Sequence, residues 1–291
     1  MIIAASSLIP ATATLGDVRP ILAPGYVTIV GGRITEVGSG PPPGRPDVEL
    51  TSGYLVPGLV DLQVNGYFGV ELGDADPAGW AEVVRRLPET GTTAFLPTFI
   101  TSPVDEMVAA LRATAEFAPA EFARGQTGAR VLGVHLEGPF ISPSRRGAHN
   151  PAWIIRPDRE TIGALLAAGS GLVRVVTLAP EIEGALAAIE QLTAAGVIVS
   201  VGHSDATAAQ VAAAAEAGAR MITHLFNAQR PMHHREPGVV GQALTDTRFG
   251  CGLIADMHHI AGPVAGLAFR AAAGRIFLVT DAAASAGMTQ G

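Results

Sequence analysis

Eight short apolar runs, separated by Ala-rich stretches, constrain the fold of this chain more than any other feature. They occupy residues 55–64, 92–99, 130–137, 173–180, 196–203, 220–226, 250–256 and 275–281. Runs of this length and composition are typical of buried strands, and the stretches between them have the composition of helices. Eight strands with crossover helices in 291 residues favour a closed (βα)8 barrel of the TIM type. No GxGxxG motif follows any of the runs, which disfavours an open Rossmann sheet.

Helices are predicted between these strands, and a smaller β unit is predicted before them. The expected helices cover residues 78–87, 104–117, 161–168, 184–195, 206–217 and 264–273. In the N-terminal part, residues 26–30 and 33–37 flank Gly31-Gly32, which indicates a hairpin. A Pro- and Gly-rich segment over residues 39–46 follows. We therefore predict a small β domain over residues 1–55 and the barrel over residues 56–291.

The basic residues narrow the possible chemistry. The sequence contains no lysine, so all 19 basic residues are arginines, and the net charge is −7. Without lysine, a Walker phosphate loop, a pyridoxal Schiff base and a carboxylated lysine between two metals are excluded. Scattered arginines on an acidic chain give no basic stripe for nucleic acid. No segment is apolar enough over its length to span a bilayer, so we expect a small-molecule partner and no membrane partner.

The compartment is predicted from Cys251 and the N-terminal residues. A single cysteine forms no internal disulfide, which fits a reducing compartment. Residues 1–16 carry no basic residue ahead of their apolar run and include Pro10, so we expect a first strand and turn there, not a secretion signal. We expect a cytoplasmic protein.

Polar residues stand at the carboxyl ends of the predicted strands, where a barrel has its catalytic mouth. They are Gln63, Asn65, Thr98, Glu137, His203, His224, Asp256 and Asp281. A lone histidine in such a place is more often a hydrogen-bonded structural residue. Glu137, His203 and His224, however, come from three different strand ends, and zinc or iron accepts one carboxylate and two imidazoles with a position left for water. We therefore predict a metal site.

Asp281 ends the last predicted strand. The structural alternative for this carboxylate is an N-cap of the next segment. Facing a metal-activated water, it would act as a general base and return the proton to a leaving amine, which suits amide hydrolysis. His135, two residues before Glu137, is expected to face away from it as a packed or supporting group.

Six segments carry a resemblance to a known family. They are LVPGLVDLQVNG, HLEGPF, RRGAHN, VGHSDAT, THLFNAQRPMHHREPG and LVTDAAASAGM. In order and spacing over residues 54 to 291 they resemble the motifs of the N-acetylglucosamine-6-phosphate deacetylases of the amidohydrolase superfamily. The resemblance implies a barrel with a small β-sandwich domain. It also implies hydrolysis of N-acetyl-D-glucosamine 6-phosphate to D-glucosamine 6-phosphate and acetate in amino-sugar catabolism.

The resemblance also implies roles for individual residues. Glu137, His203 and His224 are the implied metal ligands, and Asp281 is the implied acid and base. The implied substrate contacts are Ala148, His149, Asn227, Ala228, Arg235, Asp256, Met257, His258 and His259. The family further implies a homodimer in which Arg235 reaches the phosphate in the neighbouring site. The alternative for Arg235 is a surface ion pair with Glu236 or another carboxylate.

The sequence departs from the wider superfamily at three places. Gln63 and Asn65 stand where many amidohydrolases carry His-x-His, so we predict one divalent metal per subunit and treat these two as residues that line the site. We predict zinc, although the same ligands accept iron, cobalt or manganese. Met257-His258 replace a glycine and an aliphatic residue of relatives. The chain also stops ten residues after Asp281, so we expect an incomplete β domain and pocket.

Two other functions stay open at this stage. The same barrel and metal would serve a deacylase of another N-acyl amino sugar or of an N-acyl amino acid. A non-catalytic sugar-phosphate sensor that has kept the barrel is the alternative outside the enzymes.

Overall fold

The computed structural model describes residues 1–11, 21–123 and 128–288. They divide into two compact units, Met1–Gly58 and Leu59–Gly291. The division falls after Gly58, three residues later than the boundary expected from the sequence, after residue 55. Part of the predicted N-terminal strand and turn, residues 12–16, lies outside the described residues.

The first unit is built on one four-stranded sheet. Its strands, in the order β3-β2-β1-β4, are β1 (Ile2–Ala5), β2 (Gly25–Val30), β3 (Arg33–Ser39) and β4 (Val48–Leu50). The predicted hairpin is confirmed, since Val30 pairs with Arg33 and both intervening glycines have positive φ, 58° at Gly31 and 75° at Gly32. Apolar side chains of this unit line a cavity of about 660 Å³, so the sheet has one strongly apolar face.

The second unit is the predicted barrel, and all eight predicted strands are confirmed. In order around the sheet they are β5 (Leu59–Val64), β8 (Thr92–Ile100), β10 (Val134–Glu137), β11 (Val173–Leu178), β12 (Ile198–Val201), β13 (Met221–Ile222), β14 (Gly250–Leu253) and β15 (Ile276–Leu278). Neighbouring strands are parallel throughout. The short pieces are β6 (Gly66–Tyr67), β7 (Val70–Glu71) and β9 (Arg130–Val131), of which β9 pairs with β8.

The ring closes at the carboxyl ends of β15 and β5. Ala282 forms a parallel bridge with Val64, and its carbonyl accepts the N–H groups of Asn65 and Gly66 at 2.8 and 2.9 Å. The N–H of Asp281 donates to the carbonyl of Gln63 at 3.0 Å. Closure therefore places Asp281, the last polar strand-end residue, directly beside the first strand.

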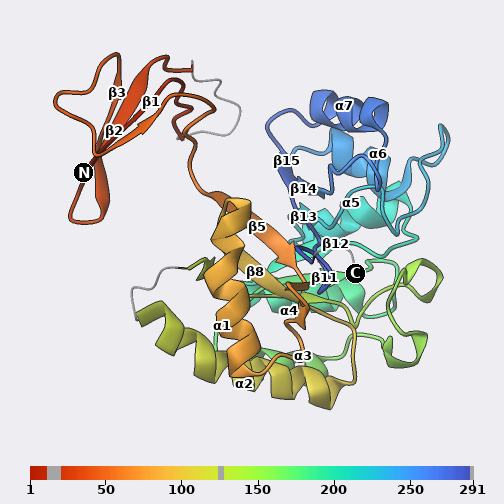
Figure 1. Cartoon of the computed structure of the whole chain (residues 1–291). Coiled ribbons are helices and arrows are strands. Elements are labelled where there is room, and N and C mark those ends of the chain that lie inside the picture. The colour runs from red at the N-terminus through yellow and green to blue at the C-terminus, as the bar shows by residue number, and fades with distance from the viewer. Residues whose placement is uncertain (12–20, 124–127, 289–291) are drawn as a thin grey trace. The chain divides into compact units, whose positions relative to one another are not determined.

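Helices follow seven of the strands and lie on the outside of the barrel (Figure 1). They are α1 (Pro77–Arg86), α2 (Val104–Ala123), α3 (Arg159–Ala168), α4 (Ala185–Ala194), α5 (Ala208–Ala217), α6 (Gly238–Thr245) and α7 (Gly262–Ala271), with short 3-10 turns at Leu87–Thr90, Pro143–Arg145 and Pro151–Trp153. Polar side chains cap the N-termini of several of these helices: Asp76 caps α1, Asp158 caps α3, and Thr207 forms a capping box with Gln210 at α5. None of the described helices is long and apolar enough to cross a membrane.

One helix was not predicted. Helix α6 contains Gly238 and Gly241, and glycine is a poor helix former, so residue composition does not indicate a helix there. The side chain of Glu236 accepts the N–H of Gly238 at 3.1 Å and satisfies one of the free donors at the helix start. Six of the eight residues of α6 are buried, which shows that packing stabilises it.

A polar layer lies inside the barrel. His135 is buried, its Nε2 lies 2.7 Å from the hydroxyl of Thr177, and that hydroxyl lies 2.6 Å from the hydroxyl of Thr223. The imidazole of His135 is kept neutral because burial lowers its pKa to about 4. The expectation that His135 faces away from Glu137 is wrong. Residues two apart on a strand share a face, and both side chains here are buried inside the barrel.

Candidate active site

Three side chains converge at the barrel mouth. Glu137 ends β10, His203 follows β12 and His224 follows β13. The Oε1 of Glu137 lies 2.9 Å from Nε2 of His203 and 2.9 Å from Nε2 of His224, and the two nitrogens are 3.1 Å apart. All three residues are at most 5% exposed. The structure thus brings together the three residues that the sequence analysis named as metal ligands.

The hydrogen bond between His203 and the carbonyl of Arg145 indicates whether Glu137, His203 and His224 suit a metal. Its Nδ1 lies 3.0 Å from the carbonyl oxygen of Arg145, and a carbonyl only accepts, so Nδ1 carries the proton. In the neutral ring the lone pair of Nε2 then faces a carboxylate oxygen of Glu137. Two acceptors at this distance need a proton or a metal ion between them. One carboxylate and two imidazoles are a ligand set for zinc or another divalent transition metal, so these residues fit a metal ion.

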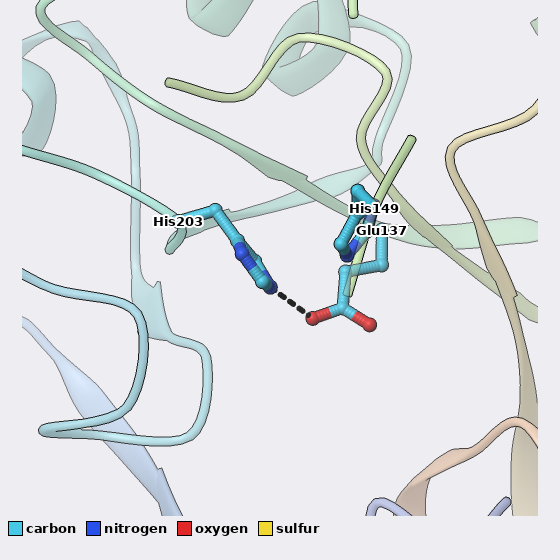
Figure 2. A group of neighbouring side chains, drawn as sticks. All are labelled: Glu137, His149 and His203. Carbon is cyan, nitrogen blue, oxygen red and sulfur yellow. Dashed lines mark hydrogen bonds and ion pairs between the residues drawn. The ribbon is translucent and has the colours of Figure 1, made fainter. Parts of the chain in front are cut away.

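His149 lies in the same group, as Figure 2 shows beside Glu137 and His203. Ligand-type atoms of these three residues all lie within 4.8 Å of one another. However, the backbone N–H of Thr101 donates to Nδ1 of His149 at 3.3 Å, and the Thr101 hydroxyl lies 2.7 Å from the same nitrogen. A backbone N–H cannot accept, so Nδ1 is unprotonated and the proton of the neutral ring sits on Nε2. His149 is thereby a hydrogen-bond donor, and His224 is the third candidate ligand. Glu137, His203 and His224 are called the metal group below.

Two amide side chains of the first strand connect the metal group to Asp281. The amide nitrogen of Gln63 donates to Oε1 of Glu137 at 3.2 Å and to Oδ1 of Asp281 at 3.0 Å. That of Asn65 donates to the same Oδ1 at 2.7 Å. Gln63 and Asn65 therefore line the site, and their N–H groups point at the carboxylates, where a second metal would need lone pairs.

Burial and neighbouring charges shift the pKa values of the residues in this site. Burial acts to raise the pKa of Glu137, but the hydrogen bonds from His203 and His224 outweigh it and bring that pKa well below the usual range. Burial acts to lower the pKa of His224, but the hydrogen bond and charge of Glu137 outweigh it and raise that pKa. Burial, followed by the charge of Glu137, raises the pKa of Asp281. Burial lowers the pKa of His149 to about 4, which keeps its ring neutral.

Backbone strain gathers at the predicted site residues. Eight non-glycine residues of the described chain have positive φ, and five of them are predicted site residues: His203 at 46°, His224 at 27°, Ala228 at 49°, Met257 at 64° and Asp281 at 51°. The left-handed region costs energy for residues with a Cβ, and proteins retain such residues chiefly where function needs their geometry.

Other predicted substrate residues lie close to the metal group along the chain and through hydrogen bonds. The N–H of Asn227 donates to the carbonyl of His224 at 2.9 Å, and the carbonyl of Ala228 accepts the N–H of Ser204 at 3.1 Å. The side-chain Nδ2 of Asn227 is buried and has no hydrogen-bond partner among the described residues. Ala148 is exposed and directly precedes His149.

The remaining predicted contacts are not joined to the metal group. Arg235 and the residues from Asp256 to His259 are exposed, and no hydrogen bond recorded for the described residues links them to Glu137 or its partners. The carboxylate of Asp256 instead accepts the N–H groups of His258 and His259 and lies 2.7 Å from Nδ1 of His259. Glu236 accepts backbone N–H groups of Ala208 and Gly238, and within the described chain it makes no ion pair with Arg235.

Three residues that shape the site were not singled out from the sequence. They are Asp61, Thr101 and Arg145, which bind Thr280, His149 and His203 respectively. Thr101 follows β8 directly and so occupies a strand-end position, which was the one usable signal. Arg145 acts through its carbonyl, which every residue has, so its identity carried no information.

Comparison with known proteins identifies the family of this chain. Residues 54–279 match the amidohydrolase family. This chain belongs to the amidohydrolase family. It is 39% identical over 275 residues to an N-acetylglucosamine-6-phosphate deacetylase of Bacillus subtilis (strain 168), a match that covers 93% of this chain and 69% of that protein. The family resemblance found in the six motifs is thereby confirmed.

Other members of the family are similarly close. An N-acetylgalactosamine-6-phosphate deacetylase of Escherichia coli O157:H7 is 40% identical over 245 residues, which is 84% of this chain and 63% of that protein. The crystal structure of N-acetyl-D-glucosamine-6-phosphate deacetylase from Mycobacterium smegmatis matches with a TM-score of 0.91 and 36% identity, over all of this chain and 73% of that one. An aspartate-to-alanine variant of that enzyme, in complex with N-acetyl-D-glucosamine-6-phosphate, matches with a TM-score of 0.88 and 35% identity. The amidohydrolase chain described here spans about two thirds of the curated relatives it matches.

Proposed function

We propose that this amidohydrolase removes the acetyl group from N-acetyl-D-glucosamine 6-phosphate and releases D-glucosamine 6-phosphate and acetate. One observation carries the proposal: Gln63 ties the carboxylate of Asp281 to the Glu137, His203 and His224 group, so a proton-transfer group stands beside a buried metal-ligand set. The family and its deacetylase relatives support the substrate class.

Glu137, His203 and His224 would hold one divalent metal, and zinc is our first choice among zinc, iron, cobalt and manganese. When bound, such an ion lowers the pKa of water and polarises a carbonyl oxygen. The protein keeps His203 correctly oriented through the carbonyl of Arg145. The N–H groups of Gln63 and Asn65 favour a single ion.

Asp281 would move the proton. Its Oδ1 accepts two amide N–H groups, while Oδ2 accepts no hydrogen bond from any described residue and is free to react. As water attacks the acetyl carbonyl carbon, Oδ2 takes one proton from the water; it then delivers that proton to the amide nitrogen as the carbon–nitrogen bond breaks. The Nε2–H of His149 would donate to the carbonyl oxygen, which gains negative charge during the attack.

The phosphate would be bound by arginine and backbone donors, because the sequence contains no lysine. Arg235 is exposed and makes no ion pair within the described chain, so its guanidinium is available. We propose that the protein is a homodimer in which Arg235 serves the neighbouring site, with His259 as a second phosphate contact. A cytoplasmic location stays our prediction from the lone Cys251.

Acetate release tests this function. The metal-loaded protein is assayed with N-acetylglucosamine 6-phosphate and with unphosphorylated N-acetylglucosamine, and we expect a strong preference for the phosphorylated sugar. N-acetylgalactosamine 6-phosphate is the second candidate substrate, because the Escherichia coli relative that bears its name is 40% identical. Release from an N-acyl amino acid, or binding of the sugar phosphate without any release, would contradict the proposal in favour of another deacylase or a sensor.

A further inference from the structure

Asp61 is a buried carboxylate that the proposed chemistry does not use. Among the described residues, the buried acidic side chains are Asp61, 5% exposed, and Glu137, 2% exposed. Glu137 belongs to the metal group, whereas Asp61 makes no ion pair with any described residue. A carboxylate costs free energy in such a place unless donors satisfy it, so its partners indicate what it does.

The donors to Asp61 come from the two ends of the barrel sheet. The hydroxyl of Thr280 donates to Oδ2 at 2.6 Å, and the N–H of Thr280 lies 3.3 and 3.2 Å from Oδ1 and Oδ2. The N–H of Gln63 donates to Oδ1 at 3.1 Å. Asp61 therefore holds Thr280, the residue before Asp281, and also the backbone of Gln63, whose side chain binds Asp281.

Thr280 also binds the peptide group that follows Asp281. Its hydroxyl donates to Asp61 and accepts the N–H of Ala282 at 3.2 Å. On the near side, the N–H of Asp281 donates to the carbonyl of Gln63 at 3.0 Å. The two peptide groups that flank Asp281 are thus both held, and between them Asp281 adopts its left-handed φ of 51°. A strained conformation persists only where the surroundings impose it.

We propose that Asp61 is a positioning residue for Asp281. Through Thr280 and the backbone of Gln63, it holds Asp281 in the strained conformation in which Gln63 and Asn65 bind Oδ1 and Oδ2 stays free for proton transfer. Asp61 touches neither the metal ligands nor the reacting atoms. The inference rests on the proposed function, because it assigns Asp61 to the proton transfer that Asp281 performs there.

Three variants test the inference. Asp61→Asn keeps the size of the side chain but turns one acceptor oxygen into a donor that faces the N–H of Thr280 or Gln63. Thr280→Val keeps the shape and removes the hydroxyl, whereas Thr280→Ser keeps the hydroxyl. In the full metal-loaded protein we expect kcat to fall about 10- to 100-fold in Asp61→Asn and Thr280→Val, with KM and metal content little changed. Thr280→Ser should retain most of the wild-type kcat.

Thr114→Val is the matched control, because it removes a buried hydroxyl that bonds only the carbonyl of Ala110 on α2. It should leave kcat unchanged even if the melting temperature falls. The inference is overturned if Asp61→Asn and Thr280→Val keep the wild-type kcat, if Thr280→Ser loses as much as Thr280→Val, or if the loss lies in KM or metal content. Should Asp61→Asn not fold, the Thr280 pair decides. A wild-type protein that releases no acetate would instead contradict the proposed function.

Discussion

The side-chain amide of Asn65 donates a 2.7 Å hydrogen bond to Oδ1 of Asp281 and so joins the carboxyl ends of the first and last barrel strands. The two residues are 216 positions apart in the sequence. Because Gln63 donates to the same oxygen, one oxygen of Asp281 is fixed by two amides and the other is left for chemistry. This asymmetry supports the assignment of Asp281 to proton transfer.

Replacing Asp281 by Asn should abolish most of the activity. Asn has nearly the same size but cannot take a proton from water, and general acid–base catalysis contributes about 10²- to 10⁴-fold, so acetate release should fall by that factor. Metal analysis should still find one ion per chain. Asp105→Asn, an exposed change at the start of α2, is the control. A variant Asp281→Asn that keeps the wild-type rate would contradict the role.

His149 should matter for rate and not for metal binding. His149→Ala removes the donor that we propose for the carbonyl oxygen, and loss of one such donor costs about 10²- to 10³-fold in kcat. Its metal content should equal that of the wild type, because the N–H of Thr101 leaves the proton of His149 on Nε2. Metal loss on the scale seen for His224→Ala would show that His149 is a ligand. Both quantities are measured on the same samples.

Metal affinity should fall as the pH is lowered. The pKa of His224 is raised, since the hydrogen bond and charge of Glu137 outweigh the lowering effect of burial. A metal must displace the proton from this ring, so below the raised pKa its apparent affinity should drop by up to about tenfold per pH unit. A competing chelator measures this between about pH 6 and pH 8, the range around an ordinary histidine pKa. Constant affinity across that range would disprove the linkage.

In the metal-free protein, the pairing of His224 with Glu137 makes the fold more stable at low pH than at high pH. A raised pKa of His224 contributes stability that is present below the ordinary histidine pKa of about 6.5 and is lost as the pH rises through the raised value. The melting temperature of the metal-free protein should therefore be lower at a pH above the raised pKa of His224 than at a pH below about 6.5. His224→Asn should remove this dependence of the melting temperature on pH.

Arg235 should control recognition of the phosphate. Arg235→Ala removes the charged donor, and a hydrogen bond to a charged group is worth about 1.5–3 kcal/mol, so KM for N-acetylglucosamine 6-phosphate should rise about 10- to 100-fold. The slow turnover of unphosphorylated N-acetylglucosamine should not change. Arg33→Ala, an exposed change in the small sheet, serves as the control. Equal losses on both sugars would place Arg235 outside phosphate recognition.

The sequence by itself determined the barrel and named the three residues that meet at its mouth. Alternation of apolar runs with Ala-rich stretches specifies strand and helix through burial and periodicity, which are local properties. The position of Glu137, His203 and His224 after such runs placed them at one rim, because parallel strands end together. Gly31 and Gly32 marked the hairpin for an equally local reason, since glycine accepts positive φ.

Only the tertiary structure decided how these residues are held. The hydrogen bonds from Thr280 to Asp61 and from Asn65 to Asp281 each join residues more than 200 positions apart, and both depend on the register at which the barrel closes. The donor role of His149 depends on the N–H of Thr101, which is a backbone group that every residue except proline offers. Burial and residue type can be inferred along a chain, but a hydrogen bond depends on two atoms meeting in space, so proton positions and side-chain aim came from the fold.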